Sequence, residues 1–212
     1  MENVINEKGI VEKFPGLRYD KKREELLGTL YIDVVCKDEY IKDNFEVKIC
    51  NLKSLVPYVF ETSRKIDRKY HHLYRDYRLC LATDLEQEIY LNTHTIEEWI
   101  EEYVIKYFIS YVFYERYNVF PFDEHSHGSE GRYEYLQKYL GVDDINVAKG
   151  IFKYVCTQKY RGHRECPCGS GQKIRNCHGK IIRDTINSNV IEILKDNYRR
   201  IKDVGRNKQK AK

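Results

Sequence analysis

The 212-residue sequence lacks the features that direct a chain into or across a membrane. It contains no apolar stretch close to the roughly 20 residues that span a bilayer, and no charged segment followed by an apolar run at its N-terminus. We therefore expect a soluble protein of the cytoplasm with no membrane partner. Internal repeats are absent as well. The length is sufficient for one compact domain and an appendage, and a hydrophobic content of 42% supports a packed core.

The net charge is only +4, but basic and acidic residues are unevenly distributed along the chain. From Lys173 onward there are 12 Lys and Arg against 4 Asp and Glu, a net charge of +8. The first 172 residues have 25 basic and 29 acidic side chains, a net charge of −4. A basic tail can contact nucleic acid or an acidic partner. Its single aromatic residue, Tyr198, offers no stacking platform, which favours a solvated charged helix.

The first half of the chain alternates apolar and polar residues in short runs separated by polar loops. This pattern predicts an antiparallel β-meander, with strands over residues 25–35, 45–50 and 56–61. Gly28 is expected to form a bulge or bend in the first of these strands. An antiparallel sheet followed by helices belongs to the α+β class.

The periodicity becomes helical at Thr95. Thr95 and Glu98 form a capping box, and apolar residues then recur with a 3.6-residue period as far as Tyr117. We expect this helix to pack on one face of the sheet as part of the core. Further helices are predicted over residues 131–140, 146–158 and 181–201. The last of them is expected to fray after Val204.

Three of the seven cysteines and one histidine lie within the 14 residues from Cys166 to Gly179. Three thiols and an imidazole complete a tetrahedral zinc shell, and the predicted ligands are Cys166, Cys168, Cys177 and His178. A Gly-Ser-Gly run lets the backbone fold back so that the last two ligands close the site. Because protein supplies all four ligands, the expected metal is a structural Zn²⁺. The alternatives are a chance cluster of reduced cysteines and a disulfide, which the odd number of thiols disfavours.

The run Cys-Pro-Cys-Gly-Ser-Gly-Gln-Lys-Ile-Arg-Asn-Cys-His-Gly at residues 166–179 resembles the SEC-C motif, the small zinc module named for the C-terminus of SecA, at nearly every position. Such modules are attached to many unrelated proteins. The resemblance implies an accessory surface that docks other macromolecules, so the function must come from the remaining chain.

Residues 10 to 120 resemble the ubiquitin-conjugating (E2) fold in the order of their parts: a meander, a loop with histidine, a short apolar-Cys-apolar run and a long helix. The segments that carry the resemblance are Val-Pro-Tyr-Val-Phe-Glu-Thr at 56–62 and His-His-Leu-Tyr-Arg-Asp-Tyr-Arg-Leu-Cys-Leu at 71–81. In E2 enzymes a Pro-containing strand ends in Phe-x-Thr, a His-Pro-Asn loop follows, and the nucleophile of Ile-Cys-Leu lies eight residues after the Asn. Cys80 lies eight residues after His72.

The sequence departs from the E2 pattern in two places. His71-His72-Leu73 stands where His-Pro-Asn would lie, and Tyr77 replaces a glycine three residues before the cysteine. The resemblance implies that Cys80 accepts an acyl group as a thioester and passes it to an amine. It also implies that His72 takes the place of the E2 asparagine and donates a hydrogen bond to the oxyanion.

Bacterial E2-like proteins of this type resemble those encoded beside cyclic-oligonucleotide synthases in antiphage defence operons. There they are implied to attach the C-terminus of the synthase to a target amine. The partner implied for this chain is therefore a protein substrate, with the synthase as the candidate.

Two interpretations of Cys80 remain open from the sequence. Positive charge on Arg75 and Arg78 favours a reactive thiolate, whereas a free cysteine on a short strand is usually a buried core residue. If Cys80 is buried, the chain is a non-catalytic adaptor that docks a protein or nucleic-acid partner through the zinc module and the basic tail. The cysteines that fit the core best are Cys36, Cys50 and Cys156.

The loop Asp-Glu-His-Ser-His at residues 123–127 has two histidines beside two acids. Such a group can bind a metal or polarise an amine, and the loop has the length of a flap over a cleft. A plain solvated turn fits the same residues.

Together these patterns divide the sequence into four parts. We expect an E2-like α+β domain at 1–140, a helical connector at 141–160, the SEC-C zinc module at 161–180, and a basic C-terminal helix and tail at 181–212.

Overall fold

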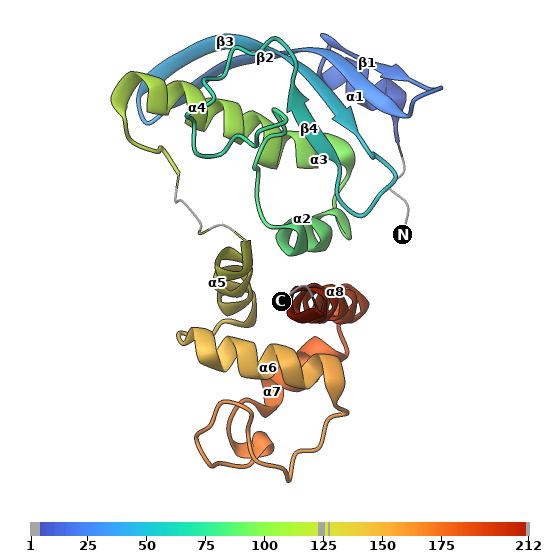
Figure 1. Ribbon diagram of the computed structural model, residues 1–212, viewed down its shortest axis with the longest axis vertical. Coiled ribbons are helices and arrows are strands. Elements are labelled where there is room, and N and C mark those ends of the chain that lie inside the picture. The colour runs from blue at the N-terminus through green and yellow to red at the C-terminus, as the bar shows by residue number, and fades with distance from the viewer. Residues whose placement is uncertain (1–4, 123–125, 127, 211–212) are drawn as a thin grey trace. The chain divides into compact units, whose positions relative to one another are not determined.

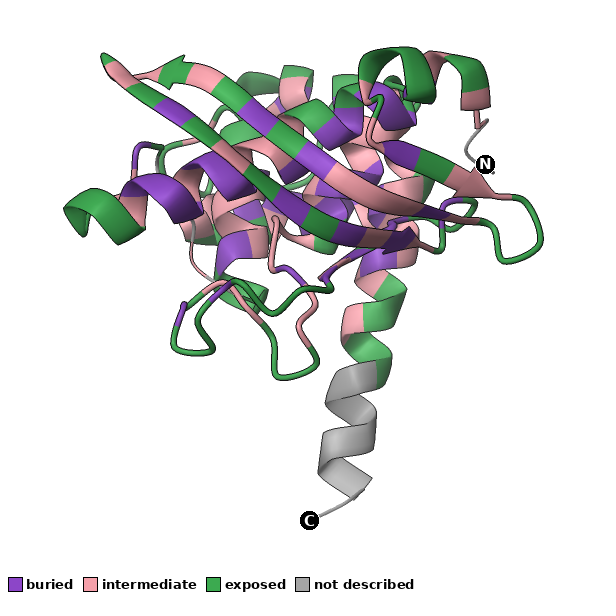
Figure 2. Ribbon diagram, turned by 90° about the horizontal axis from the view of Figure 1, so that it is seen from above, coloured by how far each residue is buried: buried purple, intermediate pink, exposed green. Residues whose placement is uncertain are grey.

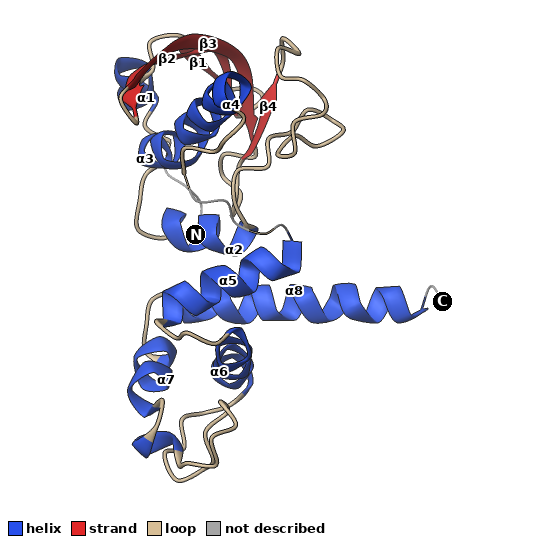
Figure 3. Cartoon of the chain, turned by 90° about the vertical axis from the view of Figure 1, so that its left-hand side faces the viewer, coloured by secondary structure: helices blue, strands red, loops and turns tan. Residues whose placement is uncertain are grey.

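The computed structural model describes residues 5–122, 126 and 128–210, with side chains in the last helix as far as Asp203. The chain divides into two compact units, Met1–Glu124 and His125–Lys212, each with its own hydrophobic core (Figure 1). The first unit is α+β, and the described part of the second consists of helices and loops (Figure 3). Among the described helices, none combines the length and the apolar character needed to cross a membrane.

Four antiparallel strands form one sheet in the first unit, in the order β1-β2-β3-β4. After the short helix α1 (Glu7–Lys13), they are β1 (Leu17–Asp20), β2 (Glu25–Cys36), β3 (Glu39–Cys50) and β4 (Tyr58–Glu61). The predicted meander is confirmed, and each predicted strand overlaps an observed one. The sequence pattern misses β1, which has only four residues.

Strand β3 begins at Glu39, well before the predicted start at residue 45. The turn that precedes it consists of Lys37 and Asp38, whose φ angles of 48° and 65° are both left-handed. Two-residue hairpin turns of this kind are usually marked by Asn-Gly or Asp-Gly. Because Lys-Asp gives no such signal, the long β2–β3 hairpin is not apparent from the sequence.

One face of the sheet packs against a long helical segment. This segment starts with α3 (Ile96–Trp99), continues through the π-helical turn η1 (Ile100–Ile105) and ends with α4 (Lys106–Tyr117). Buried and exposed residues alternate along β2 and β3 (Figure 2), as expected for strands with one face in the core. Phe45 of β3 stacks on Phe108 of α4, with their ring centroids 4.1 Å apart.

The capping box that starts this helical segment is present. The Glu98 amide donates to Thr95 Oγ1 at 3.3 Å, and the Thr95 amide donates to Glu98 Oε2 at 2.8 Å. The segment ends at Asn118, whose φ of 54° is left-handed. The predicted helix from Thr95 to Tyr117 is therefore confirmed, with a π-helical stretch that the periodicity does not indicate.

The second unit contains α5 (Gly128–Leu140), α6 (Ile145–Thr157), the 3-10 turn η2 (Ile174–Asn176), α7 (Gly179–Ile186) and α8 (Ile191–Lys210). Its core includes Leu140, Ala148, Ile151, Val155, Ile174 and Ile182. Helix α5 belongs to this unit, whereas the sequence-based division assigned residues up to 140 to the α+β domain.

The helix predicted over 181–201 is two helices. Helix α7 ends before Asn187, and the Ser188 hydroxyl donates to the Thr185 carbonyl at 2.7 Å. Ser and Asn side chains that bond to nearby backbone compete with helix continuation, which explains the break. Fraying was expected after Val204, and the backbone of α8 is helical as far as Lys210.

Gly28 occupies a position where a side chain does not fit. Its φ is +136°, and an added Cβ would lie 2.1 Å from the carbonyl oxygen of Gly16. We expect Gly28→Ala to lower the free energy of unfolding of the first unit by about 3 kcal/mol, because both φ and the contact must relax. Denaturant unfolding measures this change.

Gly141→Ala, in the second unit, is the matched control. Gly141 also has a positive φ, +63°, but an added Cβ meets no atom within 4 Å. This variant should cost only about 1 kcal/mol. Equal losses in the two variants would contradict the role assigned to the Gly16 contact.

Candidate functional site

The four predicted metal ligands, Cys166, Cys168, Cys177 and His178, are brought together in the second unit, with their ligand atoms all within 4.8 Å of one another. Cys177 Sγ is 3.6 Å from Cys168 Sγ and 3.1 Å from His178 Nδ1. Bonds of about 2.3 Å to a tetrahedral ion would place two sulfur atoms about 3.8 Å apart. The cluster therefore has the dimensions of a tetrahedral site and can hold a metal ion through three sulfurs and one nitrogen.

A tight loop presents the first two of these ligands. The Cys166 amide donates to the Gln172 carbonyl at 2.8 Å, and the Gly169 amide donates to the Cys166 carbonyl at 3.2 Å. Gly169 and Gly171 adopt left-handed φ angles of 82° and 72°. These are conformations that glycine adopts without a Cβ penalty, so the Gly-Ser-Gly run acts as the sequence predicts.

Helix α6 packs against the metal loop, residues 166–172, which carries the first two candidate ligands. Gly150 lies so close to it that an added Cβ would be 2.3 Å from the Pro167 carbonyl oxygen. Cys166 is only 4% exposed and belongs to the same core as Ile174 and Ile151. The metal loop is thus packed into the second unit rather than standing as a separate module.

The pKa values of two of the thiols are shifted in opposite directions. The Ser170 hydroxyl, 3.2 Å from Cys168 Sγ, lowers the pKa of Cys168 to about 6. Burial raises the pKa of Cys166 to about 11. Because metals bind cysteine as thiolate, metal binding here must release the Cys166 proton.

Cys80, the predicted nucleophile, lies at the end of a small β-hairpin. Leu73 and Leu79 form the central antiparallel pair of this hairpin. Next to that pair, the Cys80 amide donates to the His72 carbonyl at 2.8 Å. The structure therefore places the two predicted catalytic residues, Cys80 and His72, opposite each other as cross-strand neighbours.

The second arm of this hairpin pairs with the edge strand β4. Arg78 lies opposite Phe60, and the Leu79 amide donates to the Val59 carbonyl at 2.8 Å. Leu79 is buried in the core, and Tyr77 at the turn has a left-handed φ of 65°. The hairpin is consequently an extension of the sheet, not a free loop.

Tyr74 contributes a hydroxyl to the Cys80 site. Its amide donates to the Arg78 carbonyl at 2.9 Å across the hairpin. Its hydroxyl bonds to the Cys80 thiol, and this bond together with burial raises the pKa of Tyr74 to about 12. Tyr74 is therefore a protonated donor at neutral pH. Cys80 itself is half-buried.

The His72 ring is held by aromatic neighbours. It lies edge-on to Phe120 and Tyr70, with centroid distances of 5.5 and 5.7 Å. The Tyr107 hydroxyl of α4 donates to the His72 carbonyl at 3.0 Å. The first arm of the hairpin is thus bonded to the helix that covers the sheet.

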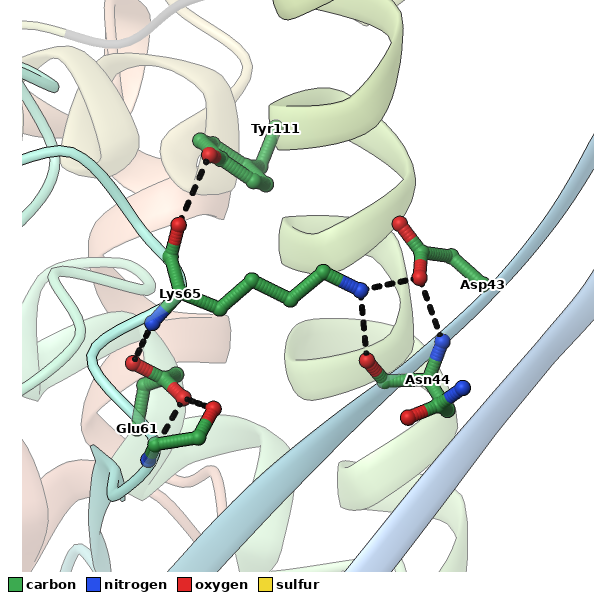
Figure 4. A network of polar contacts seen from close by, with 6 residues as sticks. Asp43, Asn44, Glu61, Lys65 and Tyr111 are labelled. Carbon is green, nitrogen blue, oxygen red and sulfur yellow. Dashed lines mark hydrogen bonds and ion pairs between the residues drawn. The ribbon is translucent and has the colours of Figure 1, made fainter.

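A polar network anchors the chain between β4 and the hairpin (Figure 4). The buried carboxylate of Glu61 accepts the Lys65 amide at 2.9 Å, and the Lys65 carbonyl accepts the Tyr111 hydroxyl at 3.3 Å. The Lys65 ammonium binds the Asp43 carboxylate and, at 2.9 Å, the Asn44 carbonyl. The network joins this segment to β3, β4 and α4 at once.

The chain after Cys80 is also tied to the core. Gln87, on α2 (Asp84–Leu91), donates from its side-chain amide to the Ala82 carbonyl at 3.0 Å. The same side chain accepts the indole N–H of Trp99 at 3.2 Å. Both Gln87 and Trp99 are buried, so the segment that follows the thiol is fixed from inside the first unit.

The remaining cysteines lie outside both clusters and are half-buried: Cys36, Cys50 and Cys156. Burial raises the pKa of Cys156 to about 12 and also raises that of Cys50. Of the predicted histidine loop, residues 123–125 and 127 lie outside the described residues. Ser126 is described, and its amide donates to Glu134 at 2.9 Å.

No protein-family model matches this chain, and no curated protein and no solved structure is significantly similar to it. The arrangement of its own residues is therefore the basis for functional inference. Sequence reasoning did not single out Tyr74, although its position opposite Arg78 follows once the 72–80 segment is taken as a hairpin.

Gly150→Ala sets two effects against each other. Alanine in a helix interior is more favourable than glycine by about 1 kcal/mol. The added Cβ would lie 2.3 Å from a backbone oxygen of Pro167, which cannot move without shifting the metal loop. We expect the contact to dominate, with weaker metal binding and a loss of about 2 kcal/mol in the stability of the second unit.

Chelator competition and denaturant unfolding measure these two quantities. Lys153→Ala, at an exposed position of the same helix, is the control and should leave both unchanged. A Gly150→Ala protein with wild-type stability and metal affinity would contradict the close approach of α6 and the loop.

Proposed function

We propose that this chain is an E2-like conjugating protein in which Cys80 carries an acyl group as a thioester and transfers it to an amine. The observation that carries the proposal is the hairpin geometry. It sets a half-buried thiol opposite His72 and in contact with the Tyr74 hydroxyl. A nucleophilic thiol held by backbone pairing on both sides is suited to covalent catalysis.

The order of elements supports the same proposal. A four-stranded meander is followed by the segment that holds His72 and Cys80, and then by the helical segment ending at Tyr117. This is the order of parts on which the E2 resemblance rests.

The tyrosine that replaces the E2 glycine is compatible with the turn. Tyr77 adopts a φ of 65°, in the region that glycine populates most readily. Its hydroxyl accepts Arg68 Nε at 2.7 Å, and the Arg68 guanidinium lies 4.7 Å from its ring centroid. These contacts offset the strain of a non-glycine residue at this position.

The proposed reaction has two steps. The Cys80 thiolate attacks the carbonyl carbon of a donor thioester, a new C–S bond forms, and the donor sulfur leaves as a thiolate. An amine then attacks the Cys80 thioester, a C–N bond forms, Cys80 leaves as a thiolate, and the amine proton passes to water. In this proposal the Tyr74 hydroxyl and the His72 imidazole N–H donate to the oxygen on which negative charge develops. The donor proposed from the resemblance is the C-terminus of a cyclic-oligonucleotide synthase.

We further propose that the Cys/His cluster holds one structural Zn²⁺. Three sulfur donors and one imidazole nitrogen form a ligand set that zinc favours, and all four positions of the tetrahedron are filled by protein. The metal would fasten the loop that packs on α6.

Loading of a fluorescent peptide carrying a C-terminal thioester tests the carrier role. Wild-type protein is expected to gain a covalent adduct that dithiothreitol removes, and to pass the peptide to an added lysine amine. Cys80→Ser should give a dithiothreitol-stable ester or no adduct, because a hydroxyl is the weaker nucleophile.

Cys36→Ser is the matched control and should load as the wild type does. Iodoacetamide labelling with peptide mapping gives an independent check. Cys80 should react ahead of Cys50 and Cys156, because burial raises the pKa of both and leaves little thiolate. A Cys80 that reacts only after denaturation would rule out the carrier role.

A non-catalytic adaptor is the second candidate, and one observation favours it. From Lys153 to Arg183 the chain has eight Lys and Arg side chains, all exposed, and Glu165 is the only acidic residue. A surface of this charge attracts nucleic acid or an acidic protein. Under this alternative, partner binding survives in Cys80→Ser and weakens steeply with added salt.

Metal content tests the zinc proposal. Freshly purified, reduced protein should contain about one zinc per chain. Chelation should abolish hydrogen-exchange protection in α6 and α7 but leave the sheet protected, because the two units have separate cores. Cys177→Ser should lose the metal, whereas Cys156→Ser should retain it. Zinc-free protein, or loss of protection in the sheet, would contradict the proposal.

A further inference from the structure

Arg78 has an unusual environment for a cation. Its guanidinium carbon lies 4.4 Å from the ring centroid of Tyr74 and 4.8 Å from that of Tyr58. Its Nε atom is buried and has no hydrogen-bond partner in the described part of the chain. None of the ion pairs among the described residues includes Arg78.

This environment leaves the guanidinium only partly compensated. The rings of Tyr58 and Tyr74 offset part of the lost hydration of the guanidinium through cation–π attraction. The rings do not satisfy the buried Nε–H donor, although Arg78 as a whole is half-buried. A buried donor without an acceptor costs free energy and calls for an explanation. The acceptor that matches the planar fork of arginine is a carboxylate or a phosphate.

Tyr74 links Arg78 to the thiol. Its ring contacts the Arg78 guanidinium, and its hydroxyl bonds to the Cys80 thiol. Arg78 and Cys80 also flank Leu79, whose side chain is in the core. Alternate residues of a strand point to the same side, so Arg78 and Cys80 share the face away from the core.

We infer that Arg78 binds a carboxylate of the acyl donor while the reacting carbon of that donor is at the Cys80 sulfur. This inference rests on the proposed function for the identity of the reaction. It narrows the donor to acyl groups that carry an acidic side chain close to the reacting carbonyl. A carboxylate is favoured over a phosphate because an acyl donor made of protein supplies it directly.

Iodoacetate and iodoacetamide test the inference without any acyl donor. In both reactions the sulfur forms a bond to the methylene carbon, and iodide leaves with the bonding electron pair. The reagents differ only in a carboxylate against a neutral amide. The measured quantity is the ratio of the iodoacetate rate to the iodoacetamide rate, followed by peptide mapping at Cys80 and, as the internal control, at Cys36.

In the wild type the ratio at Cys80 should exceed that at Cys36 about tenfold, because a charge-assisted bond holds the carboxylate beside the sulfur. Arg78→Met should bring the two ratios together. A change in the thiolate fraction of Cys80 alters both rates equally and therefore cancels in the ratio. Equal ratios in the wild type, or an unchanged ratio in Arg78→Met, would overturn the inference.

A second measurement needs no variant, in case Arg78→Met does not fold. Sodium acetate should lower the ratio at Cys80 in wild-type protein, compared with sodium chloride at equal ionic strength. No effect of acetate would also overturn the inference. Because neither reagent is an acyl donor, failed thioester loading with a raised ratio would contradict the proposed function alone. Successful loading with equal ratios would contradict the Arg78 assignment alone.

Discussion

The burial of Leu79 is the constraint on which the Cys80 region depends. Leu79 is 4% exposed, pairs with Leu73, and is bonded through its amide to Val59 of β4. With this side chain in the core, its neighbours Arg78 and Cys80 must face the other side. A slip of one residue would place Arg78 or Cys80 at the core position of Leu79 and turn the leucine out of the core, so the register is strongly specified.

Polar side chains then hold the chain on both sides of the hairpin. Glu61 and Lys65 fasten the incoming segment to β4, β3 and α4. Gln87, between Ala82 and Trp99, fastens the outgoing one. Each of these side chains binds two partners, and each lies away from the thiol. The half-buried site is therefore positioned by bonds to the sheet, to α4 and to the buried Trp99, which is the kind of support that precise chemistry requires.

Local signals in the sequence were sufficient for much of the fold and for the metal ligands. The Thr95–Glu98 capping box and the helical period after it need only neighbouring residues, and so does the clustering of Cys166 with His178. Features that depend on distant or unusual contacts were missed. The pairing of the 72–80 hairpin with β4 is non-local. Lys37 at the β2–β3 turn has a left-handed φ, which a lysine does not predict.

The close approach of Gly150 to Pro167 has a consequence for the modularity of the metal segment. Residues 166–179 contain all four candidate ligands. Their loop nevertheless rests on α6, a helix that begins more than a full turn before Gly150 and lies outside that segment. Grafting the segment onto another protein would therefore transfer the donors without the surface that shapes them. A helix of the host protein could pack against the segment only if it had a glycine at the position that contacts the Pro167 carbonyl.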